Sequence, residues 1–318
     1  MAWTNSLLLV LLRPDFAWPH RVLGEKSLAQ DIPATPELYS STVRRLWGSI
    51  HKRLVPLSRH YCQWFGIPFN NQLCQLPFGL VLKWSDGTRL EEVQAMMVAR
   101  SAGLPVPQVI SYGEHPNAPH APVSILMTRV PGSELGLIYE DLTPAQQEAI
   151  RKEMTTMLEA IRNWRSPWGK KRICSITGGP IRSVRVPFHS IGPCDDEREF
   201  DQCLIRTASD HGFPSETAFQ EKLACAKKMQ KKNHRIVFTH GDFKHHNIMV
   251  HEGHVSGFID WESAGWYPEY WDYTTALRYI PENFWWFKFV LQVGGSCYLE
   301  EREYERALLN LTVDSWAW

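Results

Sequence analysis

Hydrophobic and polar positions change their spacing along the chain, from a helical period to strand-like alternation and back. An amphipathic helix is predicted before Pro56, which should end it. Its apolar positions recur at helical spacing: Val43, Leu46, Trp47, Ile50 and Leu54. Two short runs, residues 71–76 and 79–85, then predict a pair of strands separated by a Pro- and Gly-containing turn.

Residues 89–100 predict a second helix, and the apolar run 123–130 predicts a buried strand closed by a Pro-Gly pair. A long helix follows, with Thr143 as its cap and Pro144 at its first position. The remainder is mostly helical, so a β-rich part precedes a larger helical part in an α+β fold. We expect an N-terminal extension over residues 1–36, a small lobe over 37–129 and a large lobe over 130–318.

The charge balance bears on the class of partner. The chain has 34 basic and 34 acidic residues, which argues against a nucleic-acid or anionic-membrane binder. Its seven cysteines are odd in number and show no C-x-x-C pair, which favours a reducing compartment over a disulfide framework. The run Ser6 to Leu12 is too short to span a membrane and lacks basic residues before it, so we interpret it as a docking strand or helix turn.

The densest polar chemistry lies between residues 238 and 266. His240, Asp242 and Asn247 read H-x-D-x-x-x-x-N, a short apolar strand follows, and a second apolar run leads into Asp260. Mg²⁺ prefers hard oxygen ligands and takes the rest of its shell from phosphates and water. One carboxylate with the carboxamide can therefore hold a Mg²⁺-nucleotide, while the other carboxylate accepts the proton of an incoming hydroxyl.

The histidines of this stretch allow another interpretation, a metal site. His245 and His246 are adjacent and cannot both point at one ion from a regular element, and no H-E-x-x-H is present. His251 and His254 flank a glycine in a predicted hairpin turn. A solvated loop is favoured over a histidine metal site.

The motifs "HGDFKHHN" and "IDWE" resemble the catalytic signature of protein kinases, H-R-D-L-x-x-x-N followed by D-F-G. Glycine after the histidine and tryptophan after the second aspartate resemble the aminoglycoside phosphotransferase and choline kinase family, which has a two-lobed protein-kinase-like fold. "AGWYPEYWDY" and the weaker "GPCDDEREFDQCL" (residues 192–204) resemble its fungal-type members. The resemblance covers roughly residues 76–279.

The resemblance implies a role for each motif residue. Asp242 would be the catalytic base, His240 would brace the catalytic loop, and Asn247 and Asp260 would hold Mg²⁺. Asp272 would tie down the loop through backbone N–H groups.

The small lobe should position the nucleotide. Lys83 on a strand would contact the phosphates, paired with Glu92 on the next helix or, as the alternative, Glu91. The backbone at Thr128 and Val130 would meet the base of ATP, or of GTP. No G-x-G-x-x-G loop precedes the lysine, so a non-catalytic kinase-like binding protein remains the alternative function.

The acceptor is expected to be a small molecule with a hydroxyl group, because the segment between Asp260 and Pro268 is too short for a peptide platform. Residues that could recognise it follow the second aspartate, although a structural role is favoured for each of them: Glu262, Trp266, Tyr267, Glu269 and Trp271. We expect a cytoplasmic protein that is monomeric or weakly dimeric and binds neither nucleic acid nor membrane.

Overall fold

The computed structural model describes residues 9–19 and 27–312, which fall into two compact units. Unit 1 consists of Met1–Ala29, Pro33–Gln147 and His246–Glu262, and unit 2 of Gln30–Ile32, Glu148–His245 and Ser263–Trp318, each within the described ranges. The chain leaves unit 1 and returns to it, so each unit is built from separate stretches of sequence. The sequence predicted that a lobe ending at residue 129 positions the nucleotide and that the following lobe binds the acceptor. That division of roles stays a prediction.

A four-stranded antiparallel sheet forms the centre of unit 1, in the order β1-β2-β4-β3. Its strands are β1 (Leu73–Leu76), β2 (Leu80–Lys83), β3 (Val109–Glu114) and β4 (Val123–Thr128). In the register of β2 and β4, Leu82 pairs with Leu126. The predicted strand pair and the predicted buried strand are confirmed.

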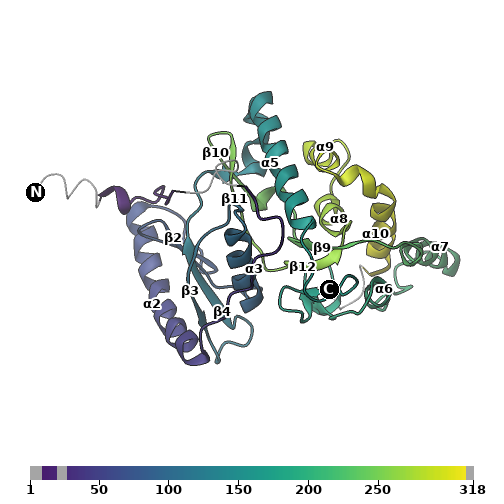
Figure 1. Ribbon diagram of the computed structural model, residues 1–318, viewed down its shortest axis with the longest axis horizontal. Coiled ribbons are helices and arrows are strands. Elements are labelled where there is room, and N and C mark those ends of the chain that lie inside the picture. The colour runs from purple at the N-terminus through teal and green to yellow at the C-terminus, as the bar shows by residue number, and fades with distance from the viewer. Residues whose placement is uncertain (1–8, 20–26, 313–318) are drawn as a thin grey trace, which may run out of the picture. The chain divides into compact units, whose positions relative to one another are not determined.

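Helices α2 (Ser41–Phe65) and α3 (Leu90–Ser101) lie on opposite sides of this sheet (Figure 1). Side chains alternate between the two faces along a strand. Leu82 accordingly packs in the apolar cluster that includes Leu54 of α2, whereas Lys83 faces α3. The sheet therefore positions a lysine on one face by burying its neighbour on the other.

Two glycines let α2 press against β3. A Cβ atom on Gly48 would lie 2.2 Å from the carbonyl oxygen of Glu114, and one on Gly113 would lie 2.4 Å from the nitrogen of Gly48. Neither distance is compatible with a side chain, so the helix-to-strand spacing depends on both glycines.

The predicted end of the first helix is wrong. Helix α2 continues through Pro56 to Phe65. Gly66 caps it with a φ of 65°, and the N–H of Gly66 donates to the carbonyl of Cys62. Proline removes one backbone hydrogen bond from a helix interior. Tertiary contacts beyond it stabilise the continuation, since Ser58 Oγ donates to the carbonyl of Gln75 at 2.6 Å.

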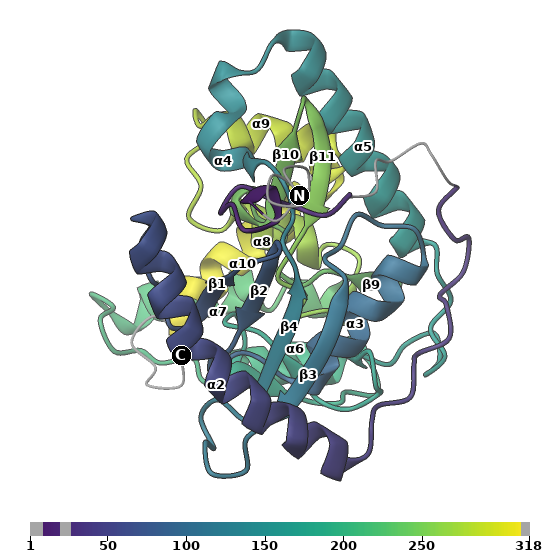
Figure 2. The same cartoon turned by 90° about the vertical axis from the view of Figure 1, so that its left-hand side faces the viewer.

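A second sheet of unit 1 contains β11 (His254–Phe258), β10 (Ile248–His251) and β5 (Ser133–Glu134), followed by the short helix α4 (Leu135–Ile138). Figure 2 shows β10 and β11 side by side. Glu252 and Gly253 connect them with φ values of 51° and 81°, as a tight two-residue hairpin requires. The predicted hairpin turn is confirmed.

Unit 2 is mostly helical around a small sheet in the order β6-β12-β9. Its larger elements are α5 (Pro144–Arg162), β6 (Cys174–Ser175), α6 (Glu197–Ile205), α7 (Glu216–Ala226), β9 (Ile236–Thr239), β12 (Gly265–Pro268), α8 (Trp271–Leu277), α9 (Trp285–Gln292) and α10 (Leu299–Thr312). A two-stranded sheet joins β7 (Ile181–Arg182) to β8 (Ser190–Ile191). The predicted cap of α5 is confirmed: Thr143 Oγ1 accepts from the N–H of Gln146 at 3.4 Å.

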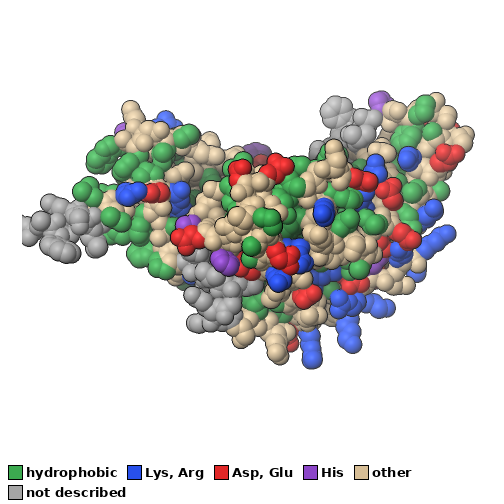
Figure 3. Space-filling model, turned by 90° about the horizontal axis from the view of Figure 1, so that it is seen from above, with side chains coloured by type: hydrophobic (Ala, Val, Ile, Leu, Met, Phe, Trp, Pro, Cys, Tyr) green, Lys and Arg blue, Asp and Glu red, His purple; other side chains and the backbone are tan. Residues whose placement is uncertain are grey.

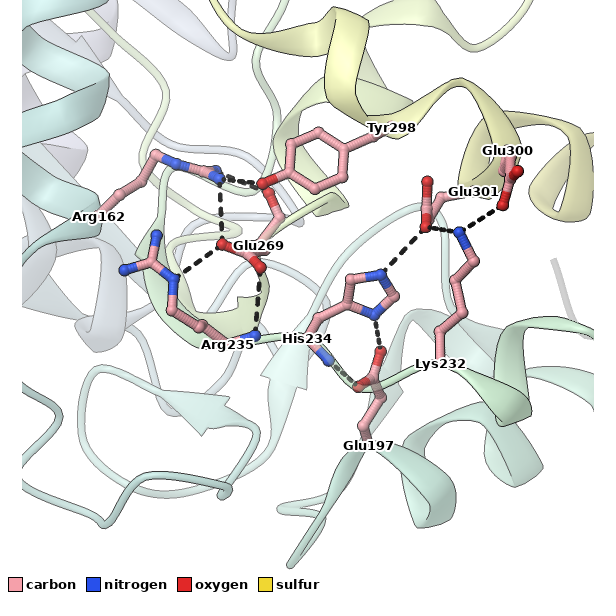
Figure 4. Close-up of polar contacts among 9 residues, drawn as sticks. All are labelled: Arg162, Glu197, Lys232, His234, Arg235, Glu269, Tyr298, Glu300 and Glu301. Carbon is pink, nitrogen blue, oxygen red and sulfur yellow. Dashed lines mark hydrogen bonds and ion pairs between the residues drawn. The ribbon is translucent and has the colours of Figure 1, made fainter.

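The aromatic residues after the second aspartate belong to the core of unit 2. Trp266, Tyr267 and Trp271 are at most 1% exposed. Glu269 accepts from Arg235 Nε at 3.0 Å, and its carboxylate lies 4.0 Å from the guanidinium of Arg162 (Figure 4). Trp266, Tyr267, Glu269 and Trp271 were open to a structural role or to a role in acceptor recognition. Their contacts within unit 2 are structural.

No helix in the described part of the chain is both long and apolar enough to cross a membrane. On the face drawn in Figure 3, acidic and basic side chains are interspersed over much of the surface. The seven cysteines are all free thiols.

Candidate active site

Lys83 and Glu92 meet within unit 1. Lys83 ends β2, Glu92 lies in the first turn of α3, and Lys83 Nζ is 2.9 Å from Glu92 Oε1. Glu92 is 1% exposed, whereas its neighbour Glu91 is half-buried. The predicted ion pair is confirmed, and the helix phase selects Glu92 over Glu91.

Two further carboxylates reach the same ammonium group. Lys83 Nζ lies 2.6 Å from Asp260 Oδ1 and 3.2 Å from Glu262 Oε2. Asp260 adopts a φ of 67°, which is uncommon for a residue with a side chain and recurs at functional sites. Glu262 was considered only for acceptor recognition. Its position two residues after Asp260 was not enough to place it at the lysine, because the backbone of Asp260 is not that of a regular strand.

One cation therefore faces three anions. Burial opposes the charge on Lys83, but Glu92, Asp260 and Glu262 outweigh it and raise the lysine pKa. Burial raises the pKa of Glu92 to about 7; Lys83 opposes this, while the other two carboxylates add to it. Lys83 therefore stays protonated, whereas the carboxyl group of Glu92, its most buried partner, is fully ionised only above neutral pH.

The cluster lies at one side of a cavity of about 330 Å³ that is formed within unit 1. This volume is in the range of small-molecule sites. Apolar side chains line much of it: Leu73, Val81, Met96, Met127, Met249 and Ile259. A cavity that combines apolar walls with charged residues suits a ligand with an apolar part and an ionic part.

The backbone predicted to meet a base also lines this cavity, at Thr128 and Val130. The N–H of Thr128 already donates to the carbonyl of Gln108 at 3.0 Å. The N–H of Val130 makes no hydrogen bond within residues 9–19 and 27–312, so it is the donor that a ligand could use.

Asn247 and Asp260 are brought together by strand pairing. The N–H of Ile259 donates to the carbonyl of Asn247 at 2.9 Å, and Ile248 pairs with Phe258 in the adjoining register. Both Asn247 and Asp260 line the cavity. A carboxylate and a carboxamide are hard oxygen donors, and the local surplus of negative charge over Lys83 favours a divalent cation. These residues fit Mg²⁺.

A short turn connects β1 to β2, the strand that ends at Lys83. It contains only Pro77, Phe78 and Gly79. The N-terminal segment holds it from two sides, since the N–H of Phe78 donates to Leu11 at 2.9 Å and Trp18 Nε1 donates to the carbonyl of Phe78 at 2.8 Å. Residues 9–11 form a helix turn, as predicted, and residues 6–8 of that run lie outside the described residues.

His240 and Asp242 follow β9 in unit 2. His240 is fully buried, and its Nδ1 accepts from the N–H of Asp242 at 3.3 Å. Gly241 between them has a φ of 87°, and a Cβ there would lie 2.1 Å from the carbonyl oxygen of Ser263. The H-G-D motif therefore requires glycine at its second position, because a side chain there would collide with Ser263.

Asp272 holds the same loop from α8. Its carboxylate accepts from the N–H groups of Gly241 at 2.9 Å and His240 at 3.2 Å, which confirms the predicted contact. Burial raises the pKa of Asp272 to about 6, although these two hydrogen bonds oppose the shift. Asp272 is 1% exposed, so the loop is tied to a buried anchor.

The other histidines of the stretch are scattered. The ring of His245 meets that of Trp286 edge to face in unit 2, whereas His246 lines the cavity of unit 1. His251 and His254 pair across the β10–β11 hairpin. Among the described residues, no group of three or more His, Cys, Asp or Glu side chains has the arrangement of a metal site.

Comparison with known proteins shows one family. The model of the phosphotransferase enzyme family matches residues 77–304. The chain is 26% identical over 208 residues to the aminoglycoside 3'-phosphotransferases of Enterococcus faecalis and of Staphylococcus aureus. Each match covers 61% of this chain and 66% of the relative, so the chain spans just under two thirds of the length of these relatives.

The fold also matches a solved structure, the GDP complex of wild-type aminoglycoside 2'-phosphotransferase-IIIa. The TM-score is 0.50, with 13% identity, 74% of this chain and 75% of that chain covered. At this identity the match concerns the fold alone. The predicted α+β, kinase-like fold class is confirmed.

Proposed function

Because this chain belongs to the phosphotransferase enzyme family, we propose that it transfers the γ-phosphoryl group of ATP to a hydroxyl group of a small molecule. The observation that carries the proposal is the cluster of Lys83 with Glu92 and Asp260 at the side of an apolar cavity. This arrangement combines a fixed cation, a carboxylate that orients it and a carboxylate able to hold a metal ion.

In this proposal the nucleotide occupies the cavity of unit 1. The base lies among the apolar side chains and accepts a hydrogen bond from the N–H of Val130, rather than from that of Thr128. Lys83 gives up its contact with Asp260 and pairs with the phosphates, and its ion pair with Glu92 is retained. Asn247 and Asp260 would hold Mg²⁺. The metal ion supplies neutralisation of the charge on the phosphoryl oxygens.

Asp242 accepts the proton of the acceptor hydroxyl in this scheme. The hydroxyl oxygen forms a bond to the γ-phosphorus, the bond from that phosphorus to the bridging oxygen breaks, and ADP leaves. His240 and Asp272 position the loop through the hydrogen bonds to its backbone. They act through the loop and do not touch the reacting atoms.

The acceptor is tested with a panel of hydroxyl metabolites, including amino alcohols, sugars, amino acids and aminoglycosides. Consumption of ATP and of GTP is measured with and without Mg²⁺. Both nucleotides are included because one protein of similar fold was solved with GDP. We expect metal-dependent turnover with one acceptor class, lost in Asp242→Asn.

A non-catalytic binding protein is the second candidate, favoured by the three-residue β1–β2 turn in place of a glycine-rich loop. Binding of Mg²⁺-ATP without turnover of any acceptor would support that candidate. Failure to bind either nucleotide would contradict both. We further expect a monomer or weak dimer, which sedimentation of the purified protein tests.

A further inference from the structure

A second polar cavity, of about 240 Å³, lies in unit 2 and has no part in the scheme above. It is formed by the start of α6 and by the segment that leads into β9. Asp196, Glu197 and Asp201 contribute carboxylates from α6 and its cap, and these residues belong to the "GPCDDEREFDQCL" stretch, to which no role was assigned. Gln230 and His234 line the cavity from the other segment.

Asp201 is the unusual member of this group. It is 3% exposed, and its Oδ2 makes no hydrogen bond within the described residues. A buried carboxyl group without a partner costs free energy, so such groups in native proteins are ordinarily satisfied by a protein group, water or a ligand. Burial raises the pKa of Asp201 to about 8; Glu197 adds to the shift and His234 opposes it.

Two of the basic residues that line this cavity, Lys232 and His234, are paired with other acids (Figure 4), and Lys171 and Arg198 also line it. His234 Nδ1 lies 2.6 Å from Glu197 Oε1, and His234 Nε2 lies 3.2 Å from Glu301 Oε1. Lys232 Nζ lies 2.6 Å from Glu301 Oε1 and is also paired with Glu300. Burial lowers the pKa of His234, but its hydrogen bonds to Glu197 and Glu301 outweigh burial and raise it. Asp201 Oδ2 thus has no hydrogen-bonded cation among the described residues, although the charge of His234 opposes the rise in the pKa of Asp201.

We propose that this cavity binds a small primary ammonium group, with the carboxylate of Asp201 as its principal hydrogen-bond acceptor. An ammonium group provides the positive charge and the N–H donors that Asp201 lacks. No group of three or more His, Cys, Asp or Glu side chains at this cavity, or elsewhere in residues 9–19 and 27–312, is arranged to hold a metal ion. Gln230, which lines the cavity from the other segment, carries a neutral acceptor oxygen.

The site is separate from the proposed catalytic aspartate. His234 precedes β9 and His240 follows it, so the two positions lie at opposite ends of a strand about 13 Å long. The ligand is therefore an additional small molecule that binds unit 2, and its recognition does not depend on the phosphoryl transfer proposed above.

Ligand binding should release a proton, since Asp201 is largely neutral in the free protein at pH 7 and ionised beside an ammonium group. The titratable and charged groups around it come from three segments. They are Asp196, Glu197 and Arg198 of α6 and its cap, Lys232 and His234 before β9, and Lys171. Tyr270 and Glu301 pack against His234. Of the carboxyl groups, Asp201 is the one held mostly protonated at neutral pH by burial.

The test uses 2-aminoethanol as the probe and ethylene glycol as its uncharged counterpart, titrated calorimetrically into the full-length protein. We expect a dissociation constant of about 1–10 mM for the amine, as a ligand this small can reach, and no binding of the glycol. Titrations in two buffers of different ionisation enthalpy should show release of close to one proton at pH 7.

The variant Asp201→Asn should weaken amine binding by tenfold or more and abolish proton release. Asp195→Asn is the matched control, since Asp195 is an exposed carboxylate of the same stretch that does not line the cavity, and its side chain pairs with Arg172. This variant should bind the amine as the parent does. Absence of amine binding by the parent protein, or binding without proton release, overturns the proposal even where the Asp201→Asn variant does not fold. Binding of acetate in place of the amine would also overturn it.

Discussion

The shared lysine makes a quantitative prediction for Glu92→Gln. Glutamine keeps the size of Glu92 and gives the Lys83 ammonium group a neutral acceptor, but it removes the negative charge from the pair. A hydrogen bond to a charged group contributes about 1.5–3 kcal/mol, against about 1 kcal/mol for a neutral one. The lysine should lose about 1.4 kcal/mol of orientation at its phosphate-binding position, which corresponds to a tenfold lower affinity for Mg²⁺-ATP.

This loss should depend on pH, because burial raises the pKa of Glu92 to about 7 in the folded protein. At pH 8 the parent carboxylate is ionised, so the substitution removes a charge and affinity falls about tenfold. At pH 6 the parent carboxyl is already mostly protonated, so affinity falls less than about threefold. The folded protein also holds this proton more tightly than the unfolded chain does, so the contribution of Glu92 to stability falls as pH rises from about 4.5 to about 7.

Calorimetric titration of Mg²⁺-ATP at pH 6 and pH 8 measures both values. Glu91→Gln is the matched control: it removes the same charge one residue away, from a half-buried side chain, and should leave affinity unchanged at both values. Equal losses in the two variants, or a loss in Glu92→Gln that does not change with pH, would refute the assignment of Glu92 as the orienting carboxylate.

Three further outcomes follow from unit 1. Gly48→Ala should lower the free energy of unfolding by about 3 kcal/mol in urea titration, because the new Cβ atom would collide with β3. Gly66→Ala is the control: its Cβ atom meets no other atom, so the loss should be about 1 kcal/mol, which is the strain of the positive φ. Burial lowers the pKa of His51 and His115 to about 4, so the unfolded chain binds more protons than the folded protein between pH 6.5 and 4. The free energy of unfolding should therefore fall as the pH is lowered through that window, by up to about 2 kcal/mol per histidine at pH 5. A pH series of thermal unfolding measures this loss. Trp18→Phe removes the hydrogen bond to the β1–β2 turn, and amide exchange at that turn should accelerate without a change in the global unfolding free energy.

Elements with a strong period were predictable from the sequence. The alternation around Lys83 and the cap at Thr143 gave a strand and a helix that the structure contains. The end of α2 was not predictable from local signals. Proline is a stop signal in isolation, but contacts of Ser58 and Tyr61 with other parts of unit 1 stabilise the helix beyond it.

The site was predictable where a motif carried the chemistry and less so where packing decides. Glu92 was preferred over Glu91 because the segment "EVQAM" aligns with the helix start of the family and with the distance to "LPVP", and the structure pairs Glu92 with Lys83. The strand pairing that aligns Asn247 with Asp260 extends the predicted hairpin. The third carboxylate, Glu262, could not be placed at Lys83 because its orientation depends on the unusual backbone of Asp260. The unpartnered Asp201 had no sequence signal, since isolation of a carboxyl group is a property of its three-dimensional surroundings.

The central claim is that Asp242 serves proton transfer while Asp260 serves the metal ion. Calorimetric titration of Mg²⁺-ATP into Asp242→Asn and Asp260→Asn, beside a turnover assay, tests it most directly. Asp242→Asn should bind Mg²⁺-ATP as the parent does while turnover falls by roughly 10²–10⁴-fold. Asp260→Asn should lose about tenfold or more in metal-dependent affinity together with turnover. Loss of nucleotide binding in Asp242→Asn with retention in Asp260→Asn, or no effect of either change, would contradict the account.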